Sequence, residues 1–246
     1  MPSTLPVFSV DELPEGAHAR LDGPEGKHAA TVRRMRSGAR LMLSDGRGGL
    51  AECRVVEASR DALELEVLDR QRVPGPELRV RLVQALVKGD RGELAVELAT
   101  EAGVDSITPW RAERCVAKWD DGPRGAKALE RWRSSARQAA KQARRAWTPV
   151  VEEPAGTSAV AESLSDCAAA VVLHESGELT LPEVPLPRQG RLTVVVGPEG
   201  GITDGELDAL VAAGARPVRL GPEVLRASTA GTVALGALGA LTERWR

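Results

Sequence analysis

Two short predicted strands, each followed by a glycine–proline turn, constrain the fold of this chain more than any other feature. Residues 192–196 lead into the motif Gly-Pro-Glu-Gly-Gly at 197–201, and residues 218–220 lead into Gly-Pro at 221–222. Short apolar runs bounded by such turns are typical of buried strands. Backbone can approach a ligand closely only where side chains are absent. The two turns therefore predict a binding crevice at the carboxyl edge of a parallel sheet.

The chain around these turns alternates between strand-like and helix-like patterns, which indicates an α/β fold with a mostly parallel sheet and helices on both faces. Thr203 followed by Glu206 predicts a capping box at a helix start, and Gly103 and Gly214 fit helix ends. The predicted strands are residues 78–87, 106–110, 171–174, 192–196 and 216–220, and the predicted helices are 93–102, 127–146, 204–213 and 228–244.

The first 73 residues show a different pattern, made of short strands. Residues 40–44, 50–56 and 62–68 fit strands, and the last of these alternates apolar and acidic residues with a period of two. This pattern is typical of a small β-barrel or sandwich. The stiff sequence Pro-Gly-Pro at 74–76 favours a break in the chain. We therefore expect two domains, at residues 1–73 and 74–246.

Composition argues against several other classes of protein. The net charge is -2, and the three cysteines are far apart with no Cys-x-x-Cys pair, which argues against a zinc site and fits a reducing compartment. Residues 1–6 do not resemble the start of a signal peptide. No apolar stretch approaches the roughly 20 residues that span a bilayer. We therefore expect a cytoplasmic protein with no metal and no membrane partner.

The glycine turns do not match the common nucleotide-binding motifs. Neither turn ends in the Gly-Lys-Ser/Thr of a phosphate loop, and neither contains Gly-x-Gly-x-x-Gly. No serine lies in a Gly-x-Ser-x-Gly elbow, so a hydrolase triad has no support. The turns instead suit a compact, mostly neutral ligand that is held by backbone groups.

Basic residues gather in several segments, although the chain is slightly acidic overall. Residues 124–145 carry eight lysines and arginines against one acid, Glu130. A solvated charged face is the commonest origin of such a run, but the imbalance favours binding of nucleic acid. The candidate nucleic-acid contacts, here and elsewhere in the chain, are Arg33, Arg34, Arg36, Lys88, Arg91, Arg144 and Arg145.

Together these motifs resemble those of the ribosomal RNA small subunit methyltransferase E family. The resemblance lies in the motif at 197–201, in Leu-Gly-Pro-Glu-Val-Leu-Arg at 220–226, and in Gln-Ala-Leu-Val-Lys-Gly-Asp-Arg at 84–91. Residues 28–38 and 113–115 add to it, so that it runs through nearly the whole chain. In one departure, many members have a glutamate where this chain has Ser228.

The resemblance implies a SPOUT fold, in which a PUA-like β-barrel domain precedes a parallel sheet whose C-terminal segment is threaded into a trefoil knot. It implies a homodimer that uses S-adenosylmethionine to methylate N3 of a uridine in small-subunit (16S) ribosomal RNA, either free or in the assembled subunit. By motif position, the cofactor pocket consists of Leu173, His174, Glu175, Val196, Gly197, Pro198, Glu199, Gly200, Gly201, Leu220, Gly221, Val224, Leu225, Arg226, Thr229 and Ala230.

Two of these residues are candidates for the chemistry itself. Arg226 is the candidate for a cation that stabilises negative charge on the acceptor base, and Glu199 is a weaker candidate for a general base. One alternative function stays open, a non-catalytic RNA-binding ribosome assembly factor with the same fold.

Overall fold

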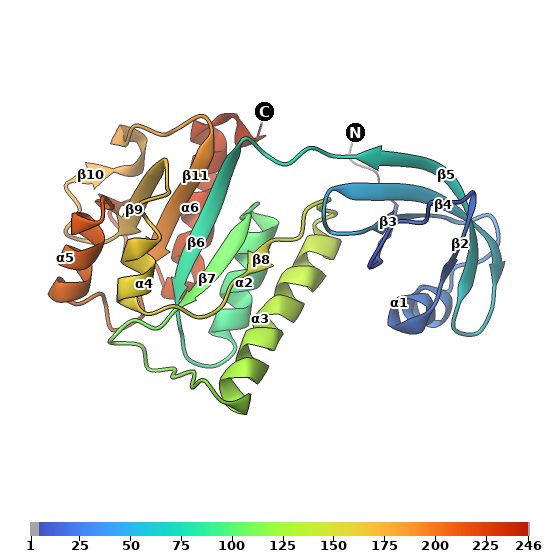
Figure 1. Ribbon diagram of the computed structural model, residues 1–246, viewed down its shortest axis with the longest axis horizontal. Coiled ribbons are helices and arrows are strands. Elements are labelled where there is room, and N and C mark those ends of the chain that lie inside the picture. Colours follow the sequence, from blue (N-terminus) through green and yellow to red (C-terminus); the bar gives the residue numbers. More distant parts are fainter. Residues whose placement is uncertain (1–4, 246) are drawn as a thin grey trace. The chain divides into compact units, whose positions relative to one another are not determined.

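The computed structural model describes residues 5–245 of the chain, which forms two compact units (Figure 1). The first unit consists of Met1–Gly75 and Ala140–Thr148, and the second of Pro76–Ala139 and Pro149–Arg246. Of the six residues on which the expectation about a signal peptide rests, residues 1–4 lie outside the described part.

The first unit is built on a five-stranded sheet with the order β1-β3-β4-β5-β2. The pairs β3·β4, β4·β5 and β2·β5 are antiparallel, and β1·β3 is parallel. Burial alternates along β4, as expected for a strand with one face on the core. The strands are β1 (Val7–Ser9), β2 (His18–Leu21), β3 (Arg40–Ser44), β4 (Gly49–Ala58) and β5 (Leu63–Arg72), and α1 (Gly23–Lys27) and η1 (His28–Val32) follow β2.

A segment far along the chain, Ala140–Thr148, belongs to this first unit. The Lys141 ammonium lies 2.7 Å from the Glu25 carboxylate, and the Trp147 indole N–H donates to the Val73 carbonyl at 3.0 Å. The predicted helix over 127–146 is wrong at both ends, because α3 spans Pro123–Gln142. It stops where Arg144 adopts a left-handed conformation with φ 54°, which cannot continue a right-handed helix.

The second unit contains a seven-stranded sheet with the order β10-β12-β9-β11-β6-β7-β8, in which every pairing is parallel. Val196 at the end of β11 pairs with Leu173 of β9 on one side and with Gln84 of β6 on the other, so the carboxyl ends of these strands lie level. The strands are β6 (Leu78–Ala85), β7 (Ser106–Trp110), β8 (Val150–Val151), β9 (Ala169–Leu173), β10 (Leu179–Thr180), β11 (Gly190–Val196) and β12 (Arg216–Arg219).

Helices between the strands complete the expected α/β alternation. They are α2 (Arg91–Glu101), α3, α4 (Thr157–Glu162), α5 (Asp204–Ala212) and α6 (Ala227–Leu241), with short 3-10 turns η2 (Leu181–Glu183) and η3 (Glu243–Trp245). Helix α6 packs against α2, β6 and β11, and α4 packs against α5. None of the helices in residues 5–245 is long and apolar enough to cross a bilayer.

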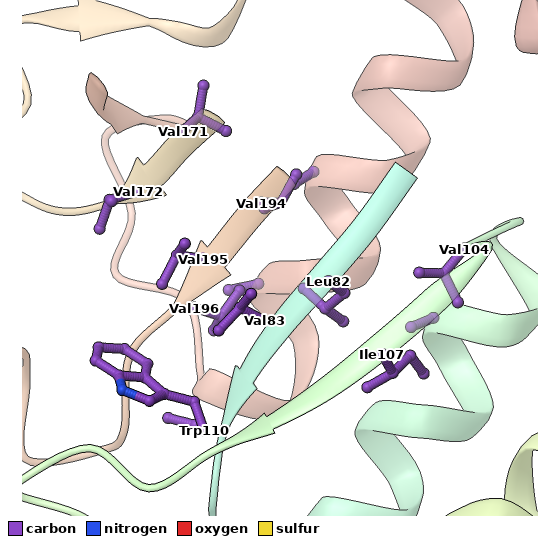
Figure 2. Packing of buried hydrophobic residues seen from close by; sticks show 14 of the residues in the cluster. Leu82, Val83, Val104, Ile107, Trp110, Val171, Val172, Val194, Val195 and Val196 are labelled. Atoms are coloured by element: carbon purple, nitrogen blue, oxygen red, sulfur yellow. The ribbon is translucent and has the colours of Figure 1, made fainter. Parts of the chain in front are cut away.

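Valine and leucine side chains fill the space around the central strands (Figure 2). Val83, Val194 and Val195 are fully buried, and so is Trp110 at the end of β7. A strand that is covered on both faces has mostly apolar side chains at successive positions, which explains why residues 192–196 do not alternate between apolar and charged side chains.

The local signals for helix ends are confirmed. Thr203 and Glu206 form a reciprocal capping box at the start of α5. Gly103 and Gly214 follow α2 and α5 with φ values of +96° and +97°, a conformation that favours glycine at a helix end.

Gly92 on α2 offers a test of the packing between α2 and α3. A Cβ at this position would lie 2.7 Å from the indole nitrogen of Trp132, which is buried and packs edge-on against Trp119. We expect Gly92→Ala to lower the free energy of unfolding by about 1–3 kcal/mol through overpacking. Urea denaturation measures this change.

Gly205→Ala is the matched control, because a Cβ there meets no atom within 4 Å. It is expected to leave stability unchanged or to raise it by up to about 1 kcal/mol, since alanine is the better helix former. Equal destabilisation by both substitutions would contradict the packing argument.

Candidate functional site

Three turns at the carboxyl edge of the second unit's sheet enclose a cleft of about 910 Å³. They follow β9, β11 and β12, three strands in which β9 pairs with both of the others. The lining residues are Arg91, Arg114, Leu173, His174, Glu175, Val196, Gly197, Pro198, Glu199, Gly200, Gly201, Ile202, Val218, Arg219, Leu220, Pro222, Glu223, Val224, Leu225, Arg226, Ala227, Ser228 and Ala230.

The structure brings together nearly all of the residues that the family resemblance assigned to a cofactor pocket. Only Gly221 and Thr229 are absent from the cleft lining among those predicted residues. Arg91 was predicted as an RNA contact and lines the same cleft. Arg114 was not predicted as a site residue. It follows β7 at the same carboxyl edge of the sheet, and that position could have singled it out.

The cleft combines an apolar lining with charges. Leu173, Val196, Ile202 and Leu225 supply apolar surface, while four arginines and three glutamates add charged groups. The side chains of Arg91 and Glu199 lie within 3.6 Å of each other, so one cation and one anion are paired. The charged lining groups are Arg91, Arg114, Arg219, Arg226, Glu175, Glu199 and Glu223.

The turn that carries Arg226 is tied to the helix and strand behind it. Arg226 is the N-cap of α6, and its carbonyl accepts the N–H groups of Thr229 and Ala230 at 2.9 Å. The carbonyl of Ala227 accepts a hydrogen bond of 3.3 Å from the buried Gln84 side chain at the end of β6. The backbone of Arg226 is thus fixed, while its side chain is exposed at the cleft.

The first turn of the cleft is held by His174. The Ser176 N–H donates to Nδ1 of His174 at 3.2 Å, and the His174 N–H donates to the Val218 carbonyl at 3.0 Å. These bonds shape the turn and join it to β12. Ser228, the departure from the family pattern, is buried in the first turn of α6 and lines the cleft.

A buried carboxylate, Glu206, joins the segments beside the cleft. It accepts hydrogen bonds from the Glu113 N–H at 2.9 Å, from the Thr157 hydroxyl at 2.8 Å and from the Thr203 N–H at 3.2 Å. Burial by itself would raise the pKa of Glu206, but these hydrogen bonds outweigh burial and hold the pKa below its ordinary value. Glu206 therefore fixes the β7–α3 loop to both α4 and α5.

The candidate RNA contacts divide between the two units. Arg33, Arg34 and Arg36 are exposed on the loop after η1 of the first unit. Arg144 and Arg145 lie just after the end of α3, in the segment Ala140–Thr148, which belongs to the same unit. Lys88 and Arg91 belong to the second unit.

The basic run of α3 is less one-sided than its sequence indicates. Arg131 pairs with Glu93 at 2.7 Å, Arg133 with Glu153 at 2.8 Å, and Lys141 with Glu25. Acids distant in sequence neutralise these cations, so the count of residues 124–145 overstates the positive charge of the helix.

A second hollow, of about 930 Å³, lies between α4 and α5 and includes Arg111, Thr157 and Glu206. None of the predicted cofactor or RNA residues lines it. Among the residues that the structure describes, no group of three or more His, Cys, Asp or Glu side chains is placed to hold a metal ion.

Comparison with known proteins identifies the family. The RNA methyltransferase domain family matches residues 74–239, and the RNA methyltransferase PUA domain family matches residues 21–68. The ribosomal RNA small subunit methyltransferase E of Mycobacterium tuberculosis is 52% identical over 97% of this chain and 93% of its own length. The chain belongs to the ribosomal RNA small subunit methyltransferase E family.

Other members and solved structures extend the match. The ribosomal RNA small subunit methyltransferase E of Bacillus subtilis is 30% identical over 97% of the chain and 96% of its own length. A Neisseria gonorrhoeae member of the family, solved with S-adenosylmethionine, has a TM-score of 0.83 at 27% identity and covers 97% of this chain and 98% of its own. A Legionella pneumophila protein described as a methyltransferase, solved with the same cofactor, has a TM-score of 0.88 at 27% identity, covering 98% and 99%.

Glu206 offers a test of the linkage beside the cleft. We expect Glu206→Gln to lower the free energy of unfolding at pH 7 by about 1.5–3 kcal/mol, because hydrogen bonds to a charged acceptor are lost. The pKa of Glu206 is depressed by folding, so its stabilisation is present above the ordinary glutamate pKa and is lost as pH falls through the lower folded value.

The difference in free energy of unfolding between wild type and Glu206→Gln should therefore shrink as pH falls below about 4.5, the ordinary pKa of glutamate. Urea denaturation at a series of pH values measures it, and a difference that stays constant down to acid pH would refute the linkage.

Proposed function

We propose that this protein is an S-adenosylmethionine-dependent methyltransferase that methylates N3 of a uridine in 16S ribosomal RNA. The observation that carries the proposal is the cleft at the carboxyl edge of the sheet, formed by the turns that hold the family motifs. Relatives at 52% and 30% identity are named as methyltransferases of small-subunit ribosomal RNA, and two structural neighbours were solved with S-adenosylmethionine.

The residues of the cleft fit this cofactor. The volume of about 910 Å³ lies within the roughly 300–1,000 Å³ of small-molecule sites. Apolar side chains such as Leu173 and Leu225 suit a flat heterocycle, and the glycine-rich turn leaves backbone groups open to hydrogen bonding. Carboxylates of Glu175 and Glu223 suit a cationic ligand. We propose that the predicted cofactor residues hold S-adenosylmethionine here.

When bound, the cofactor supplies a methyl group that is already activated by a sulfonium, so the protein chiefly has to place the acceptor in line with it. N3 of uridine carries a proton and becomes a good nucleophile only when that proton leaves. We propose that Arg226 stabilises the negative charge that then develops on the base. Glu199 is the weaker candidate for the base that takes the proton, because its carboxylate already pairs with Arg91.

Binding of RNA is proposed for both domains, with 1–73 as the PUA-like β-barrel domain and 74–246 as the methyltransferase domain. Arg33, Arg34 and Arg36 are exposed and suit contacts to phosphates. Arg91 would contact RNA at the cleft, Lys88 just after the end of β6, and Arg144 and Arg145 just after the end of α3. The target base must be unpaired or swung out to expose N3.

We further propose a homodimer that acts in the cytoplasm. Helix α6 has no charged residue, and its apolar side chains Val233 and Leu241 are exposed. An exposed apolar face on a helix favours an interface with another protein surface.

A trefoil knot in the C-terminal part is also proposed. The knot is supported by the family resemblance and by the path of the chain. Strand β12 lies beside β9, and the helix that follows β12, α6, packs on β6 and β11.

Mass mapping of 16S ribosomal RNA tests the activity. RNA or small subunits from a strain that lacks the protein should gain one methyl group at uridine N3 when incubated with the purified protein and S-adenosylmethionine. Calorimetry should detect binding of the cofactor. RNA binding without any heat from S-adenosylmethionine and without methylation would favour the assembly factor instead.

Arg226→Ala tests the proposed cation. We expect methyl transfer at saturating substrates to fall by about 100-fold, the usual cost of removing a donor from a developing oxyanion. Cofactor binding by calorimetry should persist, since the backbone of the turn is held by Gln84 and the α6 cap. Full activity of Arg226→Ala at saturating substrates would show that the assigned role is wrong.

A further inference from the structure

Arg114 reaches the cleft from the loop between β7 and α3, a different element from the three turns of the cofactor pocket. Its Nη1 donates to the Gly200 carbonyl at 3.3 Å. A Cβ on Gly200 would lie 3.1 Å from both the Cβ and the carbonyl oxygen of Arg114. The loop and the glycine turn are therefore in close contact, and a side chain at position 200 would require the loop to shift.

The backbone on either side of Arg114 is anchored. The Glu113 N–H is bonded to the buried Glu206 carboxylate at 2.9 Å. Cys115 is 4% exposed, its N–H donates to the Ala112 carbonyl at 3.1 Å, and burial raises the pKa of its thiol, as expected for an inert packing residue. Arg114 is thus an exposed side chain on a fixed support, which is the arrangement of a preorganised binding group.

Arg114 differs in its charge balance from Arg91, which lines the same cleft. Arg91 is 3.6 Å from Glu199, whereas no carboxylate in the described part of the chain lies within 4.0 Å of the Arg114 guanidinium. One N–H of Arg114 donates to the Gly200 carbonyl, and within residues 5–245 the remaining donors of the planar guanidinium contact no carboxylate. A preorganised cation without an acidic partner at a cleft suits an electron-rich ligand.

We propose that Arg114 binds a carbonyl oxygen of the acceptor uracil ring and stabilises the charge that appears when N3 loses its proton. This inference rests on the function proposed above. N3 of uridine lies between two carbonyl groups, so loss of its proton to solvent or to a base spreads negative charge over both oxygens. The N3 lone pair then forms the bond to the methyl carbon as the carbon–sulfur bond breaks, and that electron pair stays on sulfur.

Two arginines can therefore share the acceptor, because each of the two oxygens takes one guanidinium. Arg226 arrives from the turn before α6 and Arg114 from the loop after β7. Contact with the ring, rather than with a phosphate, is favoured by the closeness of Arg114 to the glycine turn, where the cofactor is proposed to lie.

The test uses the full-length protein with Arg114→Ala, Arg114→Gln and Arg114→Lys, and with 16S ribosomal RNA and small subunits from a strain that lacks the enzyme. Arg216→Ala is the matched control, since Arg216 is exposed at the start of β12, at the opposite end of that strand from the cleft. The readouts are kcat, KM, their pH dependence, cofactor binding by calorimetry, and the salt dependence of RNA binding.

We expect Arg114→Ala to lower kcat by about 100-fold while KM and cofactor affinity change by less than about threefold. The rising limb of its pH–rate profile should move to higher pH, because N3 of the bound uracil loses its proton less readily without the cation. Arg114→Lys should recover part of the rate through its charge, and Arg114→Gln should recover less. The slope of RNA binding against salt should not change, since no phosphate contact is lost.

Other outcomes overturn the proposal. A salt slope reduced by about one with kcat unchanged would make Arg114 a phosphate contact. A loss of rate by the same factor at every pH, with no recovery in Arg114→Lys, would make it a structural residue. Should Arg114→Ala not fold, the pH profiles of the lysine and glutamine variants decide the same question. If wild type transfers methyl groups and the Arg114 variants keep its kcat, this inference alone is wrong. If wild type transfers none, the proposed function is wrong too.

Discussion

The parallel register of the second unit's sheet is the constraint on which the candidate site depends. Because β9, β11 and β12 run in the same direction and are paired side by side, the turns that follow them meet at one edge. In an antiparallel sheet, turns after neighbouring strands would lie at opposite edges. The buried valines of β11 hold this register, since both faces of the strand are covered by apolar side chains.

Glycine then determines what this edge can bind. The turn after β11 lies against the β7–α3 loop so closely that a side chain at position 200 would meet the backbone of Arg114. Close packing of a turn against an anchored loop gives a rigid wall, and a rigid wall is what an aligned transfer of a methyl group requires. The same contact brings an arginine from outside the cofactor motifs into the cleft.

Glu206 shows how a local signal acquires a longer-range role. Its pairing with Thr203 as a capping box follows from their spacing of three residues alone. Its bonds to Glu113 and Thr157 come from segments 93 and 49 residues away, and these bonds fix the loop that bears Arg114. A residue that starts one helix thus also stabilises the wall of the cleft.

The sequence alone determined the elements whose cause is local. The α/β alternation, the buried strand at 192–196, the capping box and the glycine turns all follow from residues that are close in the chain, and the family motifs marked most of the cleft. Only the tertiary structure decided the pairs that are distant in sequence. The segment Ala140–Thr148 joins the first unit, the acids Glu93 and Glu153 neutralise part of α3, and Arg114 reaches the glycine turn. These outcomes depend on which surfaces the packed core brings together, and no short window of sequence records that.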